Sequence, residues 1–194
     1  MKRMILCAAA ALAAAACEGA PPVPAPASAP AADSALSIDA QLARFRDGMQ
    51  EPGALGNAFA SPDSAVRAMF RALEARDEQG LARLGMTRAE FAWLYYPGNP
   101  RTLPPYELDP GLMWMQVSAN GAGGGRKLVD VYAGRRLEYL SHACRATERY
   151  GRIALHTACA VRFRDGGVES EAVLFGGLLE HAGRYKLISL ANDL

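Results

Sequence analysis

Apolar residues follow a helical period most clearly between residues 61 and 84. Four of them recur at spacings of three and four and therefore share one face of a helix: Val66, Met69, Phe70 and Leu73. Ser61 and Pro62 suit the start of this helix, because a serine hydroxyl accepts a free backbone N–H and proline has none to satisfy. Gly80 suits a helix stop. The pattern predicts a helix from Pro62, followed by a turn and a shorter helical piece.

From Gly134 onward the period of the pattern changes to two, which is typical of strands. Apolar side chains alternate onto one face at Ile153, Leu155, Cys159, Val161 and Phe163. We expect four strands, joined by short turns into an antiparallel meander, near residues 135–146, 153–164, 168–180 and 184–192. The predicted fold class is therefore α+β, with N-terminal helices packed on a curved four-stranded antiparallel sheet.

Two further helices are predicted on the N-terminal side of the sheet. Ser37 can open a short helix that ends near Arg46. Thr87 and Glu90 have the spacing of a capping box, in which each side chain satisfies a backbone N–H at the other residue. The helix that they open carries several aromatic residues and ends before Pro97.

Proline and glycine shape the next part of the chain. Residues 97–110 contain five prolines, which predict an irregular loop. Residues 111–133 carry a helical pattern on both sides of the sequence NGAGGG at 120–125, so we expect two short helices or one weakened helix. These glycines do not indicate a phosphate site, because no strand precedes them and no Lys-Ser/Thr pair follows. No cofactor is expected.

The N-terminus indicates export and anchoring. Residues 1–16 have a positively charged start and a short apolar run, which predict a signal peptide. Small residues directly before Cys17 resemble the bacterial lipobox, which makes Cys17 the lipidated residue; cleavage at an Ala-x-Ala site is the alternative. Residues 17–35 then form a Pro/Ala-rich tether, and residues 36–194 one folded domain. We expect a lipid-anchored protein of the cell envelope, in the outer membrane and facing the periplasm.

Two cysteines remain for the folded domain, Cys144 and Cys159, and an oxidising compartment favours a disulfide between them. The predicted register opposes this pairing. A four-residue turn over 149–152 places Cys144 opposite Thr157 and leaves Cys159 diagonal to it, about 7 Å away between Cα atoms. A bulge or a shifted turn is needed to bring the two cysteines together.

Composition and charge exclude several function classes. The chain is 51% apolar and 21% charged, and its net charge is +1, so no field favours nucleic acid. It contains no HExxH, GxSxG or CxxC motif and no paired carboxylates. His142 and His156 are expected on opposite faces of the sheet, so no metal site is predicted.

Two stretches together resemble one family of folds. Residues 61–84, SPDSAVRAMFRALEARDEQGLARL, look like the first long helix of the nuclear transport factor 2-like superfamily. Residues 174–194, LFGGLLEHAGRYKLISLANDL, look like its closing hairpin and last strand. The resemblance implies the cone-shaped α+β fold of ketosteroid isomerases and polyketide cyclases. It also implies dimerisation through the exposed sheet face, where four charged residues fall: Arg162, Arg164, Glu169 and Glu171.

These observations leave three functions open. The first is a non-catalytic envelope lipoprotein that binds a small apolar ligand or a protein partner. An aromatic set could line its pocket or plug the core: Trp93, Tyr95, Tyr96, Tyr106 and Trp114. The second is a cyclase- or isomerase-like enzyme, whose candidate proton-transfer residues are His142, Tyr95 and Glu138. The third is a structural module that forms a homodimer through the sheet.

Overall fold

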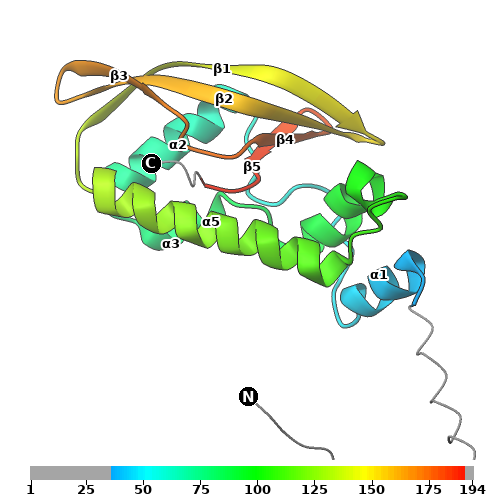
Figure 1. Ribbon diagram of the computed structural model, residues 1–194. Helices are drawn as coiled ribbons and strands as arrows, with labels where there is room; N and C mark the ends of the chain where they lie inside the picture. The colour runs from blue at the N-terminus through cyan, green and yellow to red at the C-terminus, as the bar shows by residue number, and fades with distance from the viewer. Residues whose placement is uncertain (1–35, 191–194) are drawn as a thin grey trace, which may run out of the picture. The chain divides into compact units, whose positions relative to one another are not determined.

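The computed structural model describes residues 36–190, which belong to one compact unit of the chain. The predicted signal peptide, the lipidated Cys17 and the tether fall outside the described residues. Five α-helices are present in the described part: α1 (Ile38–Arg46), α2 (Pro62–Glu74), α3 (Glu78–Arg83), α4 (Arg88–Glu90) and α5 (Pro110–Tyr132). Three short helical turns follow α4: η1 (Phe91–Tyr95), η2 (Tyr96–Gly98) and η3 (Pro100–Thr102). Figure 1 shows α2 and α5 beneath the sheet.

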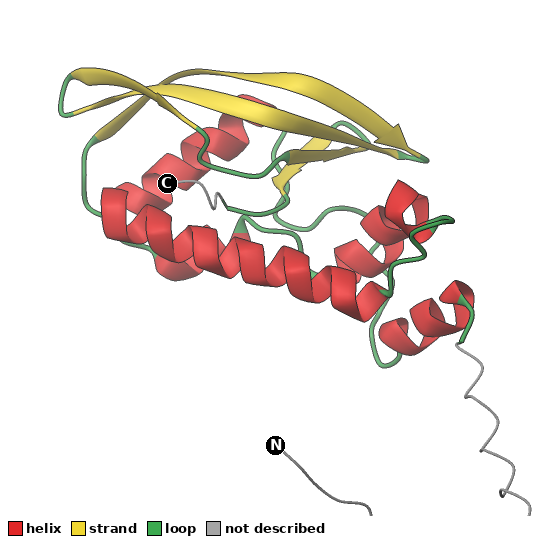
Figure 2. Cartoon of the chain, in the orientation of Figure 1, coloured by secondary structure: helices red, strands yellow, loops and turns green. Residues whose placement is uncertain are grey.

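The fold is α+β, with helices packed on an open antiparallel sheet, as predicted (Figure 2). Its five strands are β1 (Leu137–Tyr150), β2 (Ile153–Asp165), β3 (Val168–Ala172), β4 (Leu178–His181) and β5 (Arg184–Leu187). The prediction of four strands is wrong, because the stretch 168–180 is broken at residues 173–177. β3 and β4 therefore pair with opposite ends of the same edge of β2. The predicted strand 184–192 is also shorter and ends at Leu187.

Helix α2 confirms the strongest sequence pattern. Ser61 and Ser64 exchange side-chain and backbone hydrogen bonds at its N-terminus, and Pro62 occupies the first turn. The apolar face is buried, with Val66 and Met69 0% exposed and Phe70 3% exposed. It packs beneath the sheet in a core that includes Tyr139 and Phe163. Cys159, Val161 and Phe163 thus meet the helical stripe as predicted, whereas Ile153 and Leu155 pack in a second cluster.

The β1–β2 hairpin corrects the predicted register. Tyr150 pairs with Ile153, so the turn contains only Gly151 and Arg152 and not the four residues expected. Gly151 has φ +56°, a conformation that glycine adopts readily in such tight turns. The shorter turn places Cys144 directly opposite Cys159, with 3.9 Å between their Cα atoms, and the two form a disulfide.

Helix α5 is one continuous helix of 23 residues despite its glycines. Asp109 caps its N-terminus by accepting the backbone N–H of Leu112, and Pro110 occupies the first turn. Of the two predicted alternatives, two short helices or one weakened helix, the structure shows one helix. Within residues 36–190, no helix is both long enough and apolar enough to cross a membrane.

Candidate functional site

A groove runs between α3 and α5, and residues 188–190 close it on one side. It consists of two cavities, of about 390 and 270 Å³. Five residues line both cavities and so make them continuous: Leu81, Ala82, Gly121, Ala122 and Leu190. We call this feature the α3–α5 groove. Its continuity over both cavities and its mostly apolar walls suit an apolar molecule.

Small residues on α5 create the groove. Gly121 and Ala122 add almost no side-chain volume to the helix surface, and a Cβ built on Gly121 would meet only Ser189 atoms at 3.9 Å. One turn further, a Cβ on Gly125 would lie 3.2 Å from Cδ1 of Leu190. The glycines that weaken the helix intrinsically therefore allow the segment 188–190 to approach it closely.

The two ends of the groove differ in chemistry. One end is walled by Met86, Trp114, Val117 and Ile188, which offer an indole ring and aliphatic side chains. The other end carries three charged residues: Glu78, Arg126 and Asp130. An amphiphile with an apolar chain and a polar head matches this arrangement, because each part meets a wall of its own polarity.

The predicted aromatic pocket is mostly a packed core. Phe91 is 0% exposed, and its ring centroid lies 5.4 to 5.8 Å from those of three predicted pocket residues: Tyr95, Tyr96 and Trp114. Only Trp114 of these three also lines the groove. Tyr106 is 71% exposed and stands apart, whereas Trp93 lines another cavity. Sequence reasoning missed Phe91 as the centre of the cluster, although it follows the capping box directly.

The tyrosines of this cluster are held in their neutral form. Burial raises the pKa of Tyr96 to about 12, and the negative charge of Asp109 contributes in the same direction. The Tyr96 hydroxyl donates a hydrogen bond of 2.7 Å to the backbone carbonyl of Leu108. Burial also raises the pKa of Tyr95. These shifts suit structural hydroxyl groups and do not suit a general base at neutral pH.

The three candidate proton-transfer residues lie in different surroundings. His142 Nδ1 is 2.7 Å from the Tyr139 hydroxyl and 3.1 Å from Oδ1 of Asp63. Glu138 forms an exposed ion pair with Arg164, at 3.1 Å, and Tyr95 belongs to the Phe91 cluster. Burial and the hydrogen bond with Asp63 raise the pKa of Tyr139. The structure thus does not bring the three residues together, and His142 belongs instead to an Asp63–Tyr139–His142 cluster, which lines neither cavity of the groove.

His156 belongs to a separate cluster. Its Nε2 lies 3.0 Å from Oε2 of Glu180, and its Nδ1 is 2.9 Å from the Thr147 hydroxyl. Across the described residues, no group of three or more His, Cys, Asp or Glu side chains is placed to hold a metal ion.

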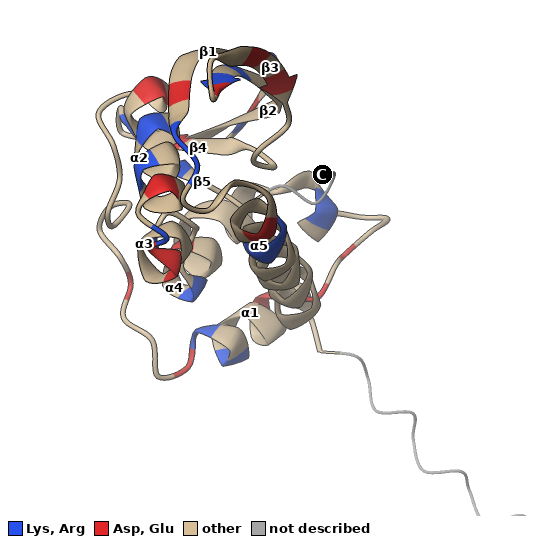
Figure 3. Ribbon diagram, turned by 90° about the vertical axis from the view of Figure 1, so that its left-hand side faces the viewer, with Lys and Arg blue, Asp and Glu red and all other residues tan. Residues whose placement is uncertain are grey.

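The predicted dimer face carries charges that are paired within the chain. Arg162 contacts Glu169 and also stands opposite Glu171 in the β2–β3 pairing, while Arg164 contacts Glu138. Figure 3 shows acidic and basic residues interspersed on this part of the sheet. The face therefore carries charges of both signs that contact one another within the chain.

Comparisons with protein-family models, with curated proteins and with solved structures find no match to this chain.

Proposed function

We propose that this chain is a bacterial envelope lipoprotein whose folded domain binds an amphiphile in the α3–α5 groove without transforming it. The α3–α5 groove carries this proposal. It is continuous over two cavities, lined mostly by apolar residues and charged at one end. A single acyl chain is narrow enough for such a groove and gains free energy by leaving water, at roughly 25 cal/mol per Å² of apolar surface.

The surroundings of the groove support binding more than catalysis. Its polar end holds Glu78, Arg126 and Asp130, which offer both signs of charge to a head group. The hydrogen-bonded Asp63–Tyr139–His142 cluster lies outside the groove, so a ligand bound there meets none of these three side chains. The N-terminal sequence supports the envelope location, since a lipidated Cys17 and the spacer to residue 35 would keep the domain near lipids.

Dodecanoate is a suitable probe, and Trp114 reports on its binding. The protein is produced with Cys17→Ser and a replacement signal peptide, so that neither a lipid anchor nor detergent enters the assay. Trp93→Phe removes the other of the two tryptophans. Dodecanoate should change the Trp114 fluorescence saturably, and butanoate at the same concentration should not, because the free energy of transfer grows with each buried CH₂.

Two leucine substitutions on α5 form a matched pair. Ala122→Leu fills the groove, whereas Ala119→Leu adds the same side chain at an exposed position that does not line it. We expect Ala122→Leu to abolish dodecanoate binding and Ala119→Leu to preserve it. Equal binding by both variants would contradict the groove as the site.

Anchoring is tested separately from ligand binding. Intact-mass measurement of protein from its own envelope should show a diacylated or triacylated N-terminus at Cys17, and Cys17→Ser should release the chain from the outer-membrane fraction. An unlipidated chain would remove the anchor from the proposal but would leave the groove to be judged by the dodecanoate result.

The second candidate function is proton transfer in a cyclase- or isomerase-like enzyme. The contact of His142 Nδ1 with Tyr139 and Asp63 favours it, because a carboxylate and a phenol can orient an imidazole. His142→Ala distinguishes the two functions: dodecanoate binding should persist in this variant, whereas an enzyme of this class would lose turnover.

A further inference from the structure

Exposed apolar side chains gather at one end of the folded domain. Eight large apolar residues are exposed within residues 36–190, and four of them fall between residues 103 and 115: Leu103, Tyr106, Leu112 and Met115. Their exposed fractions are 59%, 71%, 42% and 58%. Single exposed apolar residues are common on proteins, but four within one short segment mark an interaction surface. We call these four residues the apolar tip, and none of them lines the α3–α5 groove.

The loop that carries the first two residues of the apolar tip is closed at its base. The backbone N–H of Leu108 donates to the carbonyl of Arg101 at 2.8 Å. Beside this bond, the Thr102 hydroxyl donates to the carbonyl of Asn99 at 2.8 Å, and both of these residues are buried. Residues 103–107, in contrast, are all exposed. The loop therefore presents its apolar side chains to solvent from a fixed base.

The other two residues of the apolar tip belong to the first turns of α5. Leu112 and Met115 are three positions apart, so their side chains are neighbours on the helix surface. Another face of the same turns lies in the core, where Met113 is 2% exposed. Packing of the helix within the domain requires only that buried face to be apolar, so the exposed leucine and methionine call for a further partner.

The polar residues around the apolar tip indicate the chemistry of that partner. Arg101, Glu107 and Asp109 are exposed and offer both signs of charge. This mixture suits zwitterionic lipid head groups, while leucine side chains suit the boundary of the acyl chains. Tyr106 fits the same boundary, because its ring is apolar and its hydroxyl can stay with polar groups.

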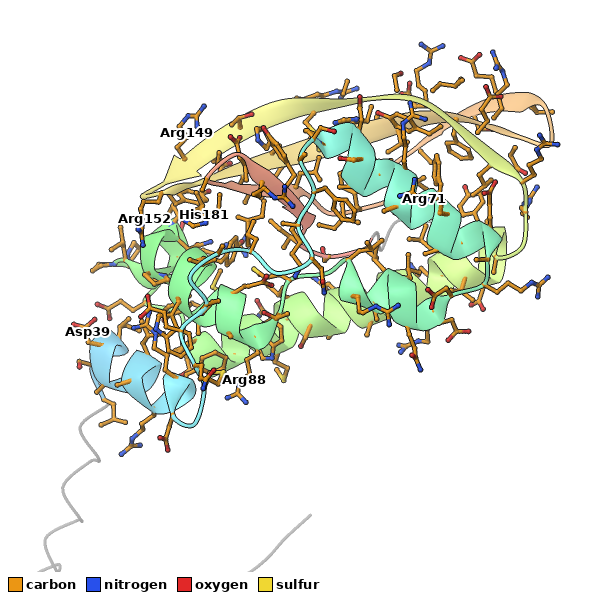
Figure 4. All side chains as sticks on the ribbon, turned by 180° about the vertical axis from the view of Figure 1, so that it is seen from behind. Asp39, Arg71, Arg88, Arg149, Arg152 and His181 are labelled. Atoms are coloured by element: carbon orange, nitrogen blue, oxygen red, sulfur yellow. A yellow bond between two sulfur atoms is a disulfide. The ribbon has the colours of Figure 1, made fainter. Side chains whose placement is uncertain are left out.

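The described chain enters the domain at this same end. Helix α1 packs on the Phe91 cluster through Phe45, whose ring centroid lies 5.7 Å from that of Phe91. Figures 1 and 4 show α1 and the short helical turns that lead into α5 at one end of the domain. Leu36, just before α1, is a further exposed apolar residue. Residues 18–35 separate it from the predicted lipid at Cys17 by at most about 60 Å of extended chain.

We propose that the apolar tip docks on the surface of a lipid bilayer, with Leu103 and Tyr106 at the boundary between head groups and acyl chains. The inference rests on the proposed lipid anchor for the nearness of the bilayer, and it does not depend on amphiphile binding in the α3–α5 groove. Docking brings the N-terminal end of α5 to the membrane, and burial of apolar surface drives it.

Flotation with phosphatidylcholine vesicles tests the surface without the anchor. The Cys17→Ser chain with its replacement signal peptide should float with the vesicles at low and at high salt, because charge does not drive the contact. Leu103→Ser combined with Tyr106→Ser should weaken partitioning by at least about tenfold. Val168→Ser combined with Val173→Ser is the matched control, since it removes two exposed apolar side chains at β3 and should leave partitioning unchanged.

A dye on the loop locates the contact directly. In the same chain, Tyr106→Cys introduces a free thiol for an environment-sensitive dye, because Cys144 and Cys159 are bonded to each other. Vesicles should shift the dye emission to the blue, and acyl-brominated phosphatidylcholine should quench it, whereas a dye attached through Val168→Cys should show neither effect. Ala122→Leu, which fills the groove, should leave these results unchanged, so a failure of the groove and a failure of the apolar tip are distinguishable.

Several results would overturn the proposal. These are a Cys17→Ser chain that does not float, equal partitioning of the two double variants, and an unshifted dye at position 106. A blue shift without vesicles that grows with protein concentration would also overturn it, because it would place a second copy of the chain on the apolar tip.

Discussion

Lys186 and Glu90 form an ion pair that is shielded from water at the junction of β5 and α4. The Nζ atom of Lys186 lies 2.9 and 3.0 Å from the two carboxylate oxygens of Glu90, and the residues are 0% and 2% exposed. Lys186 also donates to the backbone carbonyl of Gly56, and Glu90 accepts the backbone N–H groups of Gly56 and Thr87. The pair thus joins three distant segments, and every partner is satisfied within the protein.

Removing the cation from this pair should be costly. Lys186→Met leaves the Glu90 carboxylate buried without its counter-charge, so we expect the free energy of unfolding to fall by about 3–5 kcal/mol. Urea unfolding followed by circular dichroism measures the change. Arg162→Gln breaks the exposed contact with Glu169 and is the control, with an expected loss below about 1 kcal/mol. Similar losses in the two variants would show that burial does not set the strength of the pair.

The disulfide should stabilise the domain mainly by restricting the unfolded chain. Cys144 and Cys159 are 15 residues apart, which corresponds to about 3 kcal/mol in the chain-entropy model. Replacing both by alanine should lower the urea midpoint by a corresponding amount. Reductant should lower the midpoint of the unsubstituted protein and leave that of the double variant unchanged, whereas a response of both proteins would point to another cause.

Two glycine-to-alanine changes should have opposite signs. Gly121 lies within α5, and a Cβ there would meet nothing closer than 3.9 Å, so Gly121→Ala should stabilise the helix by up to about 1 kcal/mol. Gly134 has φ +78°, and a Cβ there would lie 2.5 Å from Nε of Arg76. Gly134→Ala should therefore destabilise the protein by about 1–3 kcal/mol. Thermal unfolding of both variants tests this prediction. A Gly134→Ala variant as stable as the unsubstituted protein would contradict it.

Tyr96 should make the protein less stable in alkali. Its pKa is raised from 10.0 to about 12 in the folded state, so the unfolded chain releases the phenol proton first as the pH rises. The contribution is complete below pH 10 and is lost as the pH approaches 12, on the order of 1 kcal/mol by pH 11. In Tyr96→Phe the loss of stability between pH 9 and pH 11 should shrink by that amount. Tyr106→Phe, at an exposed position, should reproduce the unsubstituted pH profile in urea unfolding.

Local signals in the sequence predicted the elements that depend on neighbouring residues. The capped start and apolar stripe of α2, and the Thr87–Glu90 capping box, follow from spacings of three and four residues, and the structure confirms both. The period-two pattern predicted strands in the C-terminal region, and the even number of remaining cysteines predicted their pairing. The same rules gave the wrong register for β1 and β2, because turn length decides register and several lengths fit the residues around Gly151.

The candidate sites depended on contacts that no local pattern encodes. Phe91 was expected in a helix, but its position at the centre of the aromatic cluster follows from the packing of α5 against η1. The segment that crosses between β3 and β4 places His181 in the wall of a cavity that Trp93 also lines. Predicting either position requires the path of distant segments, which hydrophobic periodicity does not specify.

The sequence by itself determined the fold class, the placing of helices before strands along the chain, and the cysteine pair, because each rests on the periodicity or composition of nearby residues. Only the tertiary structure decided the partner of Glu90, the groove along the glycines of α5 and the burial of His181 beside Ile153. These features join residues up to 130 positions apart, as Gly56 and Lys186 are. Such contacts depend on how whole elements pack, and local sequence constrains that packing only weakly.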